Sequence, residues 1–179
     1  MKAEAGPLLR TARLDLWKPQ AGDLDGLMAL IAAEETRRYL GQRPVDTMNE
    51  GNRLLRNAGS WALYGYGSFV VRLSGRPEVI GACGVFHSWR GFGKGMDDTP
   101  EAGWIIHADH CGKGLAGEAM RAALAWFDAT HGRRRIACMI EEGNTASERV
   151  AASLGFARYG RHAPETEGEA ALMLFERTG

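Results

Sequence analysis

The fold is decided by one ten-residue stretch, HCGKGLAGEA, which spans residues 110–119. Its three glycines lie between a predicted strand over 101–107 and a predicted long helix over 114–131. Glycines at such a junction let backbone N–H groups turn toward an anion, and the start of a helix adds about half a positive charge. The stretch therefore predicts a site for a phosphate or a pyrophosphate. The alternative is a tight strand-to-helix turn in which the glycines only relieve steric crowding.

On either side of this stretch, hydrophobic periodicity and turn residues divide the chain into strands and helices. Strands are expected over 13–17, 68–73, 79–87, 101–107, 135–140, 156–159 and 170–175, and helices over 24–31, 48–61, 114–131 and 144–154. Ser74-Gly75-Arg76-Pro77 reads as a hairpin turn, which makes the strands on either side antiparallel neighbours. The later strand–helix–strand run requires at least one parallel crossover. The sequence therefore predicts an α+β fold with a mixed, mostly antiparallel sheet flanked by helices.

Composition excludes several classes of protein. The chain has 179 residues, 22 Lys and Arg, 22 Asp and Glu, and 24 glycines, which is well above the average glycine usage of about 7%. That length fits a single domain over residues 1–179. A formal net charge of zero argues against binding nucleic acid by phosphate neutralisation and against a polybasic membrane binder.

Cysteine usage and hydropathy point to the compartment. The three cysteines are widely spaced, no stretch is apolar enough to span a membrane, and Met1 to Arg13 contains no apolar core of a signal peptide. We therefore expect a reduced, cytoplasmic protein with neither a disulfide framework nor a structural zinc, and with no nucleic-acid or membrane partner. A homodimer is compatible with the sequence.

Two anion-binding patterns can be tested on residues 112–117. The letters GKGLAG match the G-x-G-x-x-G dinucleotide fingerprint, and Glu141 or Glu142 follows at about the required distance. This match alone would make the chain an NAD(P)-binding oxidoreductase. A Rossmann half, however, needs more parallel strands than the chain after Gly117 can supply, and its fingerprint normally lies in the first βα turn. The sequence contains no Walker A loop.

A second pattern is more specific, because it joins two spaced motifs. Residues 101–106, EAGWII, lead into the glycine stretch, and residues 144–156, NTASERVAASLGF, follow one helix and one strand later. Together they resemble the GNAT superfamily of acetyl-CoA-dependent N-acetyltransferases, and most of all its branch of ribosomal-protein N-terminal (Rim-type) acetyltransferases. Cys111 stands where the family's loop motif has Gln or Arg. Residues 10–16 are similar to the family's first strand, so the resemblance covers essentially the whole chain.

The resemblance implies a fold in which two parallel central strands, here 101–107 and 135–140, splay apart. Acetyl-CoA would be the co-substrate, with its pyrophosphate on the glycine loop and its pantetheine arm between the strands, and no metal is implied. The residues expected to bind it are Ile105, Ile106, His107, Cys111, Gly112, Lys113, Gly114, Leu115, Ala116, Gly117, Asn144 and Ser147.

The resemblance also implies direct attack of a primary amine on the thioester in a ternary complex. Many relatives carry a Tyr seven residues after the Asn as the acid. Ala151 stands there in this chain, so Ser147, on the same helical face as Asn144, is the expected proton donor to the leaving sulfur. Glu101 is the candidate base. The alternatives are a packing role for Ser147 and a solvated strand end for Glu101.

The acceptor amine has no motif of its own. A protein N-terminus and a small-molecule amine both remain open, because the loops 61–67, 88–100 and 161–169 carry no recognisable pattern. Trp89 is expected to line the acceptor mouth. A non-catalytic CoA-binding sensor with the same fold is a further alternative.

Overall fold

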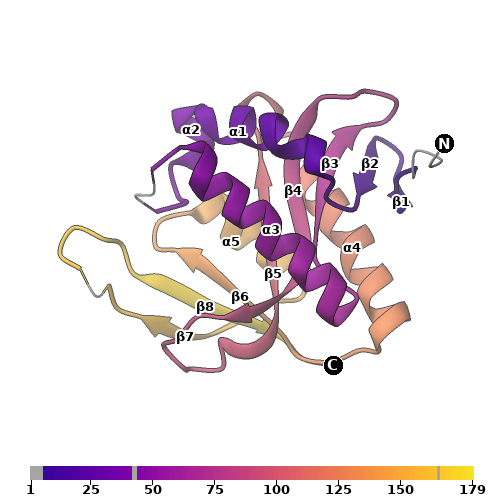
Figure 1. Ribbon diagram of the computed structural model, residues 1–179. Helices are drawn as coiled ribbons and strands as arrows, with labels where there is room; N and C mark the ends of the chain where they lie inside the picture. Colours follow the sequence, from indigo (N-terminus) through magenta and orange to yellow (C-terminus); the bar gives the residue numbers. More distant parts are fainter. Residues whose placement is uncertain (1–5, 42–43, 165) are drawn as a thin grey trace.

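The computed structural model describes residues 6–41, 44–164 and 166–179. Its strands form one eight-stranded sheet in the order β1-β2-β3-β4-β5-β6-β8-β7 (Figure 1). The strands are β1 (Leu9–Arg10), β2 (Leu14–Trp17), β3 (Ser68–Leu73), β4 (Val79–Trp89), β5 (Asp97–Ile106), β6 (Ile136–Glu141), β7 (Ala157–His162) and β8 (Leu172–Arg177). Only the β5–β6 pair is parallel among the described strands. The predicted α+β class with a mostly antiparallel sheet is confirmed.

In the described part of the chain, five α-helices flank the sheet. They are α1 (Leu24–Ala32), α2 (Glu34–Arg37), α3 (Thr47–Tyr64), α4 (Leu115–His131) and α5 (Thr145–Ser153), with short 3-10 turns at Ala21–Asp23 and Ala108–His110. None of the described helices is both long enough and apolar enough to cross a bilayer.

Alternate side chains of the strands face two different helical layers. Phe69 and Val71 of β3 belong to the core cluster that also holds Met120 and Phe127 of α4, whereas Val70 between them is equally buried on the opposite face. That opposite face is covered by α1 to α3, and α3 crosses in front of the sheet in Figure 1. The sheet therefore separates an α1–α3 face from an α4 face.

The two central strands part after a short contact. β5 and β6 pair only at Glu101–Ala137 and Ala102–Cys138. Beyond Ala102, β5 remains paired with β4 on its other side, and β6 remains paired with β8. The predicted splay of the parallel central strands is therefore confirmed, and it leaves a gap in the middle of the sheet.

Some element boundaries differ from the sequence prediction. α3 extends beyond the expected 48–61, because the Asp46 side chain accepts a hydrogen bond from the Asn49 N–H at 2.8 Å at its start and Gly65, with φ of 78°, ends it. β4 ends at Trp89 and β5 begins at Asp97, so the loop expected over 88–100 is shorter. The carboxylate of Asp97 fixes this loop by accepting the backbone N–H groups of two of its glycines. The short strand β1 was not predicted.

Candidate active site

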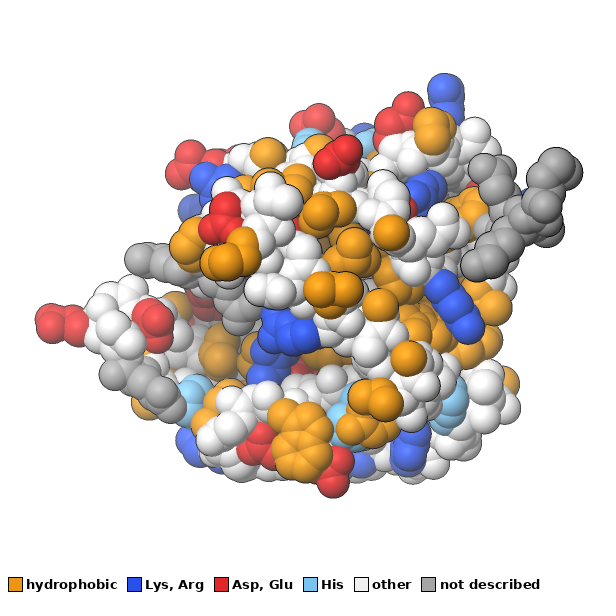
Figure 2. Space-filling model, viewed as in Figure 1, with side chains coloured by type: hydrophobic (Ala, Val, Ile, Leu, Met, Phe, Trp, Pro, Cys, Tyr) orange, Lys and Arg blue, Asp and Glu red, His pale blue; other side chains and the backbone are white. Residues whose placement is uncertain are grey.

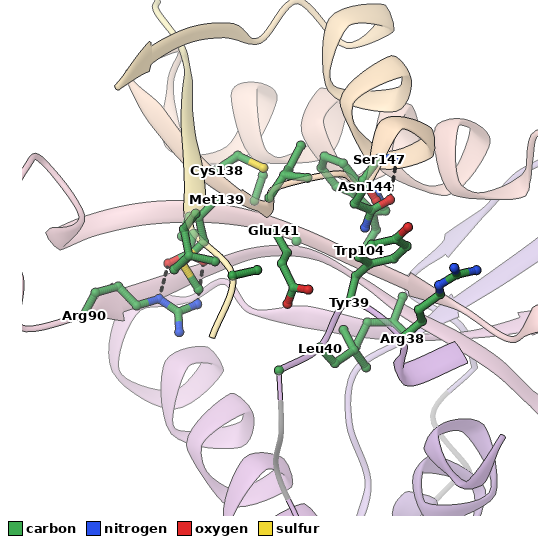
Figure 3. Close-up of a pocket in the computed structure, with 18 of the residues that line it drawn as sticks. Arg38, Tyr39, Leu40, Arg90, Trp104, Cys138, Met139, Glu141, Asn144 and Ser147 are labelled. Carbon is green, nitrogen blue, oxygen red and sulfur yellow. Dashed lines mark hydrogen bonds and ion pairs between the residues drawn. The ribbon is translucent and has the colours of Figure 1, made fainter. Parts of the chain in front are cut away.

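A cavity of about 600 Å³ opens where β5 and β6 separate. Its walls come from β5 and β6, the start of α5, the segment after α2, one turn of α3 and the segment before β8. Figure 3 shows Trp104, Glu141, Asn144 and Ser147 around this space, with Tyr39 below them. Figure 2 shows that the face carrying α3 is hollowed beneath that helix, with basic side chains at the rim. The cavity therefore reaches from the start of α5 to the α1–α3 face.

The glycine stretch forms the junction between β5 and α4. Gly112 and Gly114 both have φ of 74°, in the left-handed region that other residues adopt only at a cost. The helix begins at Leu115, whose side chain is buried and anchors the first turn. The Lys113 ammonium turns back and donates to the Asp109 carbonyl at 2.7 Å. The resulting bend and helix start have the geometry of an anion site.

A clamp from the first strands holds this junction in place. The Arg13 guanidinium donates to the Lys113 carbonyl at 2.9 Å and to a Glu118 carboxylate oxygen at 2.7 Å, and the Thr11 hydroxyl donates to the other Glu118 oxygen at 2.6 Å. Although partial burial opposes its charge, the hydrogen bonds from Thr11 and Arg13 hold the pKa of Glu118 below its ordinary value. Glu118 thus ties α4 to the start of the sheet.

The edge of β5 that faces the gap offers backbone groups to a ligand. His107 donates its N–H to the Ile80 carbonyl on β4 at 2.8 Å. The backbone N–H and C=O groups of successive residues point to opposite sides of a strand. Those of Ile105 therefore point toward β4, as in His107, and those of Trp104 and Ile106 point to the open side. Of the three positions predicted for backbone contact, Ile106 faces the gap, while Ile105 lines the cavity with its side chain. Sequence reasoning missed Trp104, because the register was not known.

The start of α5 forms the opposite wall. The Asn144 side-chain oxygen accepts the Ser147 N–H at 3.1 Å and caps the helix (Figure 3). Both residues line the cavity. Within the described part of the chain, no residue shares a hydrogen bond with the Ser147 hydroxyl. Ala151, where relatives carry a Tyr, is fully buried in the core.

Glu101 is not the solvated strand end that the sequence left as an alternative. Its residue is 2% exposed, and its two oxygens accept hydrogen bonds from Arg90 Nε at 2.8 Å and Arg90 Nη2 at 2.5 Å. Both residues line the cavity on the α1–α3 side. A buried carboxylate held by a two-pronged guanidinium is a strongly oriented group.

The cysteines near the cavity are kept in the thiol form. Cys138 lines the cavity, and burial, followed by the nearby charge of Glu101, raises its pKa. Burial also raises the pKa of Cys111 in the glycine stretch. Because the thiolate is the nucleophilic form, neither cysteine is activated for attack on a thioester.

A second carboxylate, Glu141 at the end of β6, lies in the middle of the cavity (Figure 3). Burial raises its pKa, and a smaller opposing effect comes from the Gly41 backbone N–H that hydrogen-bonds it. Sequence reasoning considered Glu141 and Glu142 only as the acid of a dinucleotide fingerprint. Glu142 is exposed and pairs with Arg161 at 3.1 Å. A signal for Glu141 was available in the sequence, because this charged residue directly follows the predicted central strand over 135–140.

The rest of the cavity wall on the α1–α3 side was largely missed by the sequence analysis. It includes residues 38–41 after α2, Arg53 of α3, Phe86 of β4 and residues 168–170 before β8. Trp89, which is expected to line the acceptor mouth, is 67% exposed and is not among the residues that line the cavity. Among the described residues, no three His, Cys, Asp or Glu side chains converge on a possible metal site.

Comparisons with known proteins agree with this geometry. The family model described as "Acetyltransferase (GNAT) domain" matches residues 13–157. The uncharacterized N-acetyltransferase p20 of Bacillus licheniformis is 27% identical over 153 residues, covering 85% of this chain and 83% of that protein. A solved structure from Bordetella pertussis, assigned to the GnaT acetyltransferase family, is 36% identical with a TM-score of 0.83, covering 95% of this chain and 98% of the other.

A more distant neighbour carries the cofactor. RimL, a ribosomal L7/L12 alpha-N-protein acetyltransferase solved in complex with coenzyme A, has a TM-score of 0.75 at 14% identity, covering 94% of this chain and 95% of its own. At that identity the likeness is one of fold.

Proposed function

The chain belongs to the GNAT acetyltransferase family, and we propose that it transfers the acetyl group of acetyl-CoA to a primary amine by direct attack in a ternary complex. One observation carries the proposal. The free edge of β5 leads from an anion-type loop into a cavity whose far wall holds two carboxylates, Glu101 and Glu141. A thioester laid along that edge would have its carbonyl carbon in the cavity, within reach of an amine from the α1–α3 face.

Binding of acetyl-CoA would use mainly backbone groups. The N–H groups of the loop from Cys111 to Gly117 and the start of α4 would hold the pyrophosphate. The open-edge groups of Trp104 and Ile106 would pair with the amides of the pantetheine arm as with an added strand. The Asn144 cap uses only the side-chain oxygen, which leaves the amino group to donate to the same arm.

Ser147 would supply the proton that the leaving sulfur needs. Its hydroxyl borders the cavity, and the N–H of Ser147 is fixed by Asn144, so the first turn of α5 sets its position. A covalent acyl-enzyme is not part of the proposal, because burial keeps the thiols of Cys138 and Cys111 protonated. The neutral amine would attack the thioester carbon itself.

Glu101 is the base proposed from the sequence, but its ion pair with Arg90 restricts how it could accept a proton. Since both of its oxygens are held by Arg90, it could accept a proton only through an oxygen lone pair that this ion pair leaves free. We place the reaction in the cytoplasm, where the three thiols would stay reduced.

A screen of coenzyme A release tests the proposed function. Purified protein is incubated with acetyl-CoA and one of four amines: an alanyl tripeptide amide, L-methionine, spermidine or kanamycin. The proposal requires release of free coenzyme A with at least one amine and binding of acetyl-CoA in calorimetry. No binding of acetyl-CoA at millimolar concentration would contradict it.

Two other functions make different predictions in the same assays. Binding of NAD(P)H instead of acetyl-CoA would indicate the oxidoreductase, although the sheet has only one parallel pair among its described strands, which is too few for a Rossmann half. Binding of coenzyme A without release from any amine would indicate a non-catalytic sensor.

A further inference from the structure

Glu141 lies on the α1–α3 side of the cavity, at the end of β6. Ile136, Cys138 and Ile140 of β6 point into the core beneath α4. Side chains alternate along a strand, so Met139 and Glu141 point to the α1–α3 face. Ser147 approaches the cavity from α5, which packs on α4. A reacting centre in the gap would therefore have Ser147 and Glu141 on different sides.

Among the described residues, the three arginines that line the cavity with Glu141 are already paired with other carboxylates. Arg90 of the loop after β4 binds Glu101, and Arg53 of α3 binds Glu50 at 3.1 Å. Arg38, at the end of α2, lies 3.9 Å from Glu35. Tyr39, Cys138 and Glu169 are the other titratable groups that line the cavity. In the described part of the chain, no Lys or Arg forms an ion pair with Glu141.

The Glu141 carboxylate also has a backbone neighbour in the α1–α3 layer. The Gly41 N–H, in the segment after α2, interacts with the carboxylate and opposes the effect of burial on its pKa. A carboxylate has about four acceptor positions, so one N–H leaves room for an ammonium group. Burial raises the pKa of Glu141 toward neutrality, which makes it a better proton acceptor than a solvated Glu.

We propose, on the basis of the acetyltransferase function proposed above, that Glu141 binds the ammonium group of the acceptor and removes its proton. The nitrogen lone pair released in this way forms the N–C bond with the thioester carbon, and the C–S bond breaks. The thiolate takes a proton from the Ser147 hydroxyl, and the second proton that the nitrogen loses as it becomes an amide returns to Ser147. The proton on Glu141 leaves to water, which restores the carboxylate. Acetyl-CoA and an ammonium ion thus give an acetamide, coenzyme A and one proton. In this proposal Glu141 takes the role of base that the sequence suggested for Glu101, because Arg90 occupies both oxygens of Glu101.

The test is the pH dependence of Glu141→Gln, with Glu142→Gln as the matched control. The rate constant kcat/KM is measured for whichever of the four amines in the screen the wild type acetylates fastest. Without this base, the variant can acetylate only the fraction of the amine that is already neutral in solution. We expect kcat/KM about 10²-fold lower near neutral pH, and a deficit that shrinks as pH rises toward the pKa of the amine. Glu141→Asp should restore part of the activity, and Glu142→Gln should behave as the wild type.

The outcomes separate the two proposals. A deficit in Glu141→Gln that is the same at every pH, or no deficit, would overturn the role of Glu141 while leaving the acetyltransferase function intact. Calorimetry with acetyl-CoA checks that the variant is folded and binds the cofactor with an unchanged Kd. If the wild type releases no coenzyme A with any of the four amines, the proposed function fails, and the role of Glu141 fails with it.

Discussion

The two sides of the cavity are built in different ways. On the proposed cofactor side, β5, the glycine stretch, α4, β6 and α5 follow one another within residues 97–153, and the proposal assigns much of the ligand contact to backbone groups. On the acceptor side, the wall is assembled from side chains of Tyr39, Arg53, Phe86, Glu141 and Glu169, which are far apart in the sequence. A site made of backbone groups therefore needs only local geometry, whereas a site made of side chains depends on the complete fold.

This difference has a functional consequence. Substitutions on the cofactor side should change binding of acetyl-CoA or the departure of the sulfur, whatever amine is used. Substitutions on the acceptor side should change the kinetics of the amine and leave the affinity for acetyl-CoA alone. A cofactor-side substitution that changed only the kinetics of the amine, or an acceptor-side substitution that changed the affinity for acetyl-CoA, would contradict this division.

Ser147→Ala should have the largest effect. If Ser147 protonates the leaving sulfur, kcat should fall at least about 10²-fold with every accepted amine, and the Kd for acetyl-CoA should stay within about twofold. Coenzyme A release and calorimetry measure the two quantities. Thr145→Ala, at an exposed position in the same helical turn, is the control. An unchanged kcat would indicate that Ser147 has only a packing role.

Gly114→Ala should weaken binding of acetyl-CoA about tenfold. A side chain at φ of 74° costs roughly 1–2 kcal/mol, and the loop would relax at the expense of its anion-binding geometry. Calorimetry gives the Kd. Gly75→Ala introduces the same strain in a distant hairpin, with φ of 71°, and should lower stability without changing the Kd. Equal Kd values for both variants would show that the loop does not bind the cofactor.

Phe86→Ala should raise the KM for the amine several-fold, because Phe86 contributes to the acceptor-side wall. The Kd for acetyl-CoA should not change. Trp89→Ala is the matched control on the same strand, since Trp89 is exposed and outside the cavity. An effect of Trp89→Ala equal to that of Phe86→Ala would place the acceptor elsewhere.

Glu118→Gln should have the smallest effect, one on stability. The pKa of Glu118 is lowered in the folded chain, so its carboxylate contributes stability above the ordinary glutamate pKa of about 4.3. That contribution is lost as pH falls through the lowered folded pKa. Urea unfolding should show the variant about 0.5–1 kcal/mol less stable near neutral pH, with the difference vanishing in acid. Glu35→Gln, at an exposed position, should show no such trend, and a pH-independent difference for Glu118→Gln would contradict the clamp.

The same division separates the features that could be predicted from the sequence from those that could not. The strand–glycine loop–helix unit and the Asn144 cap were predictable, because left-handed glycines and caps are local requirements. The splay of β5 and β6 was expected from family resemblance. Other features depend on the sheet register and on long-range packing. They are the pairing of Arg90 with Glu101, the contribution of residues 38–41 to the cavity wall and the central position of Glu141 in the cavity. Trp89 lies outside the cavity wall, and the sequence could not show this, because an aromatic residue beside a loop does not reveal which way the strand faces.

A rapid-mixing experiment tests the central claim, direct transfer between the two sides of the cavity, most directly. Protein is mixed with a stoichiometric amount of acetyl-CoA, first alone and then with the accepted amine, and free thiol is followed while the mass of the chain is recorded. The structure predicts no coenzyme A release and no mass gain until the amine is added. A burst of coenzyme A without amine, with one acetyl group retained on the chain at Cys138 or Cys111, would contradict it.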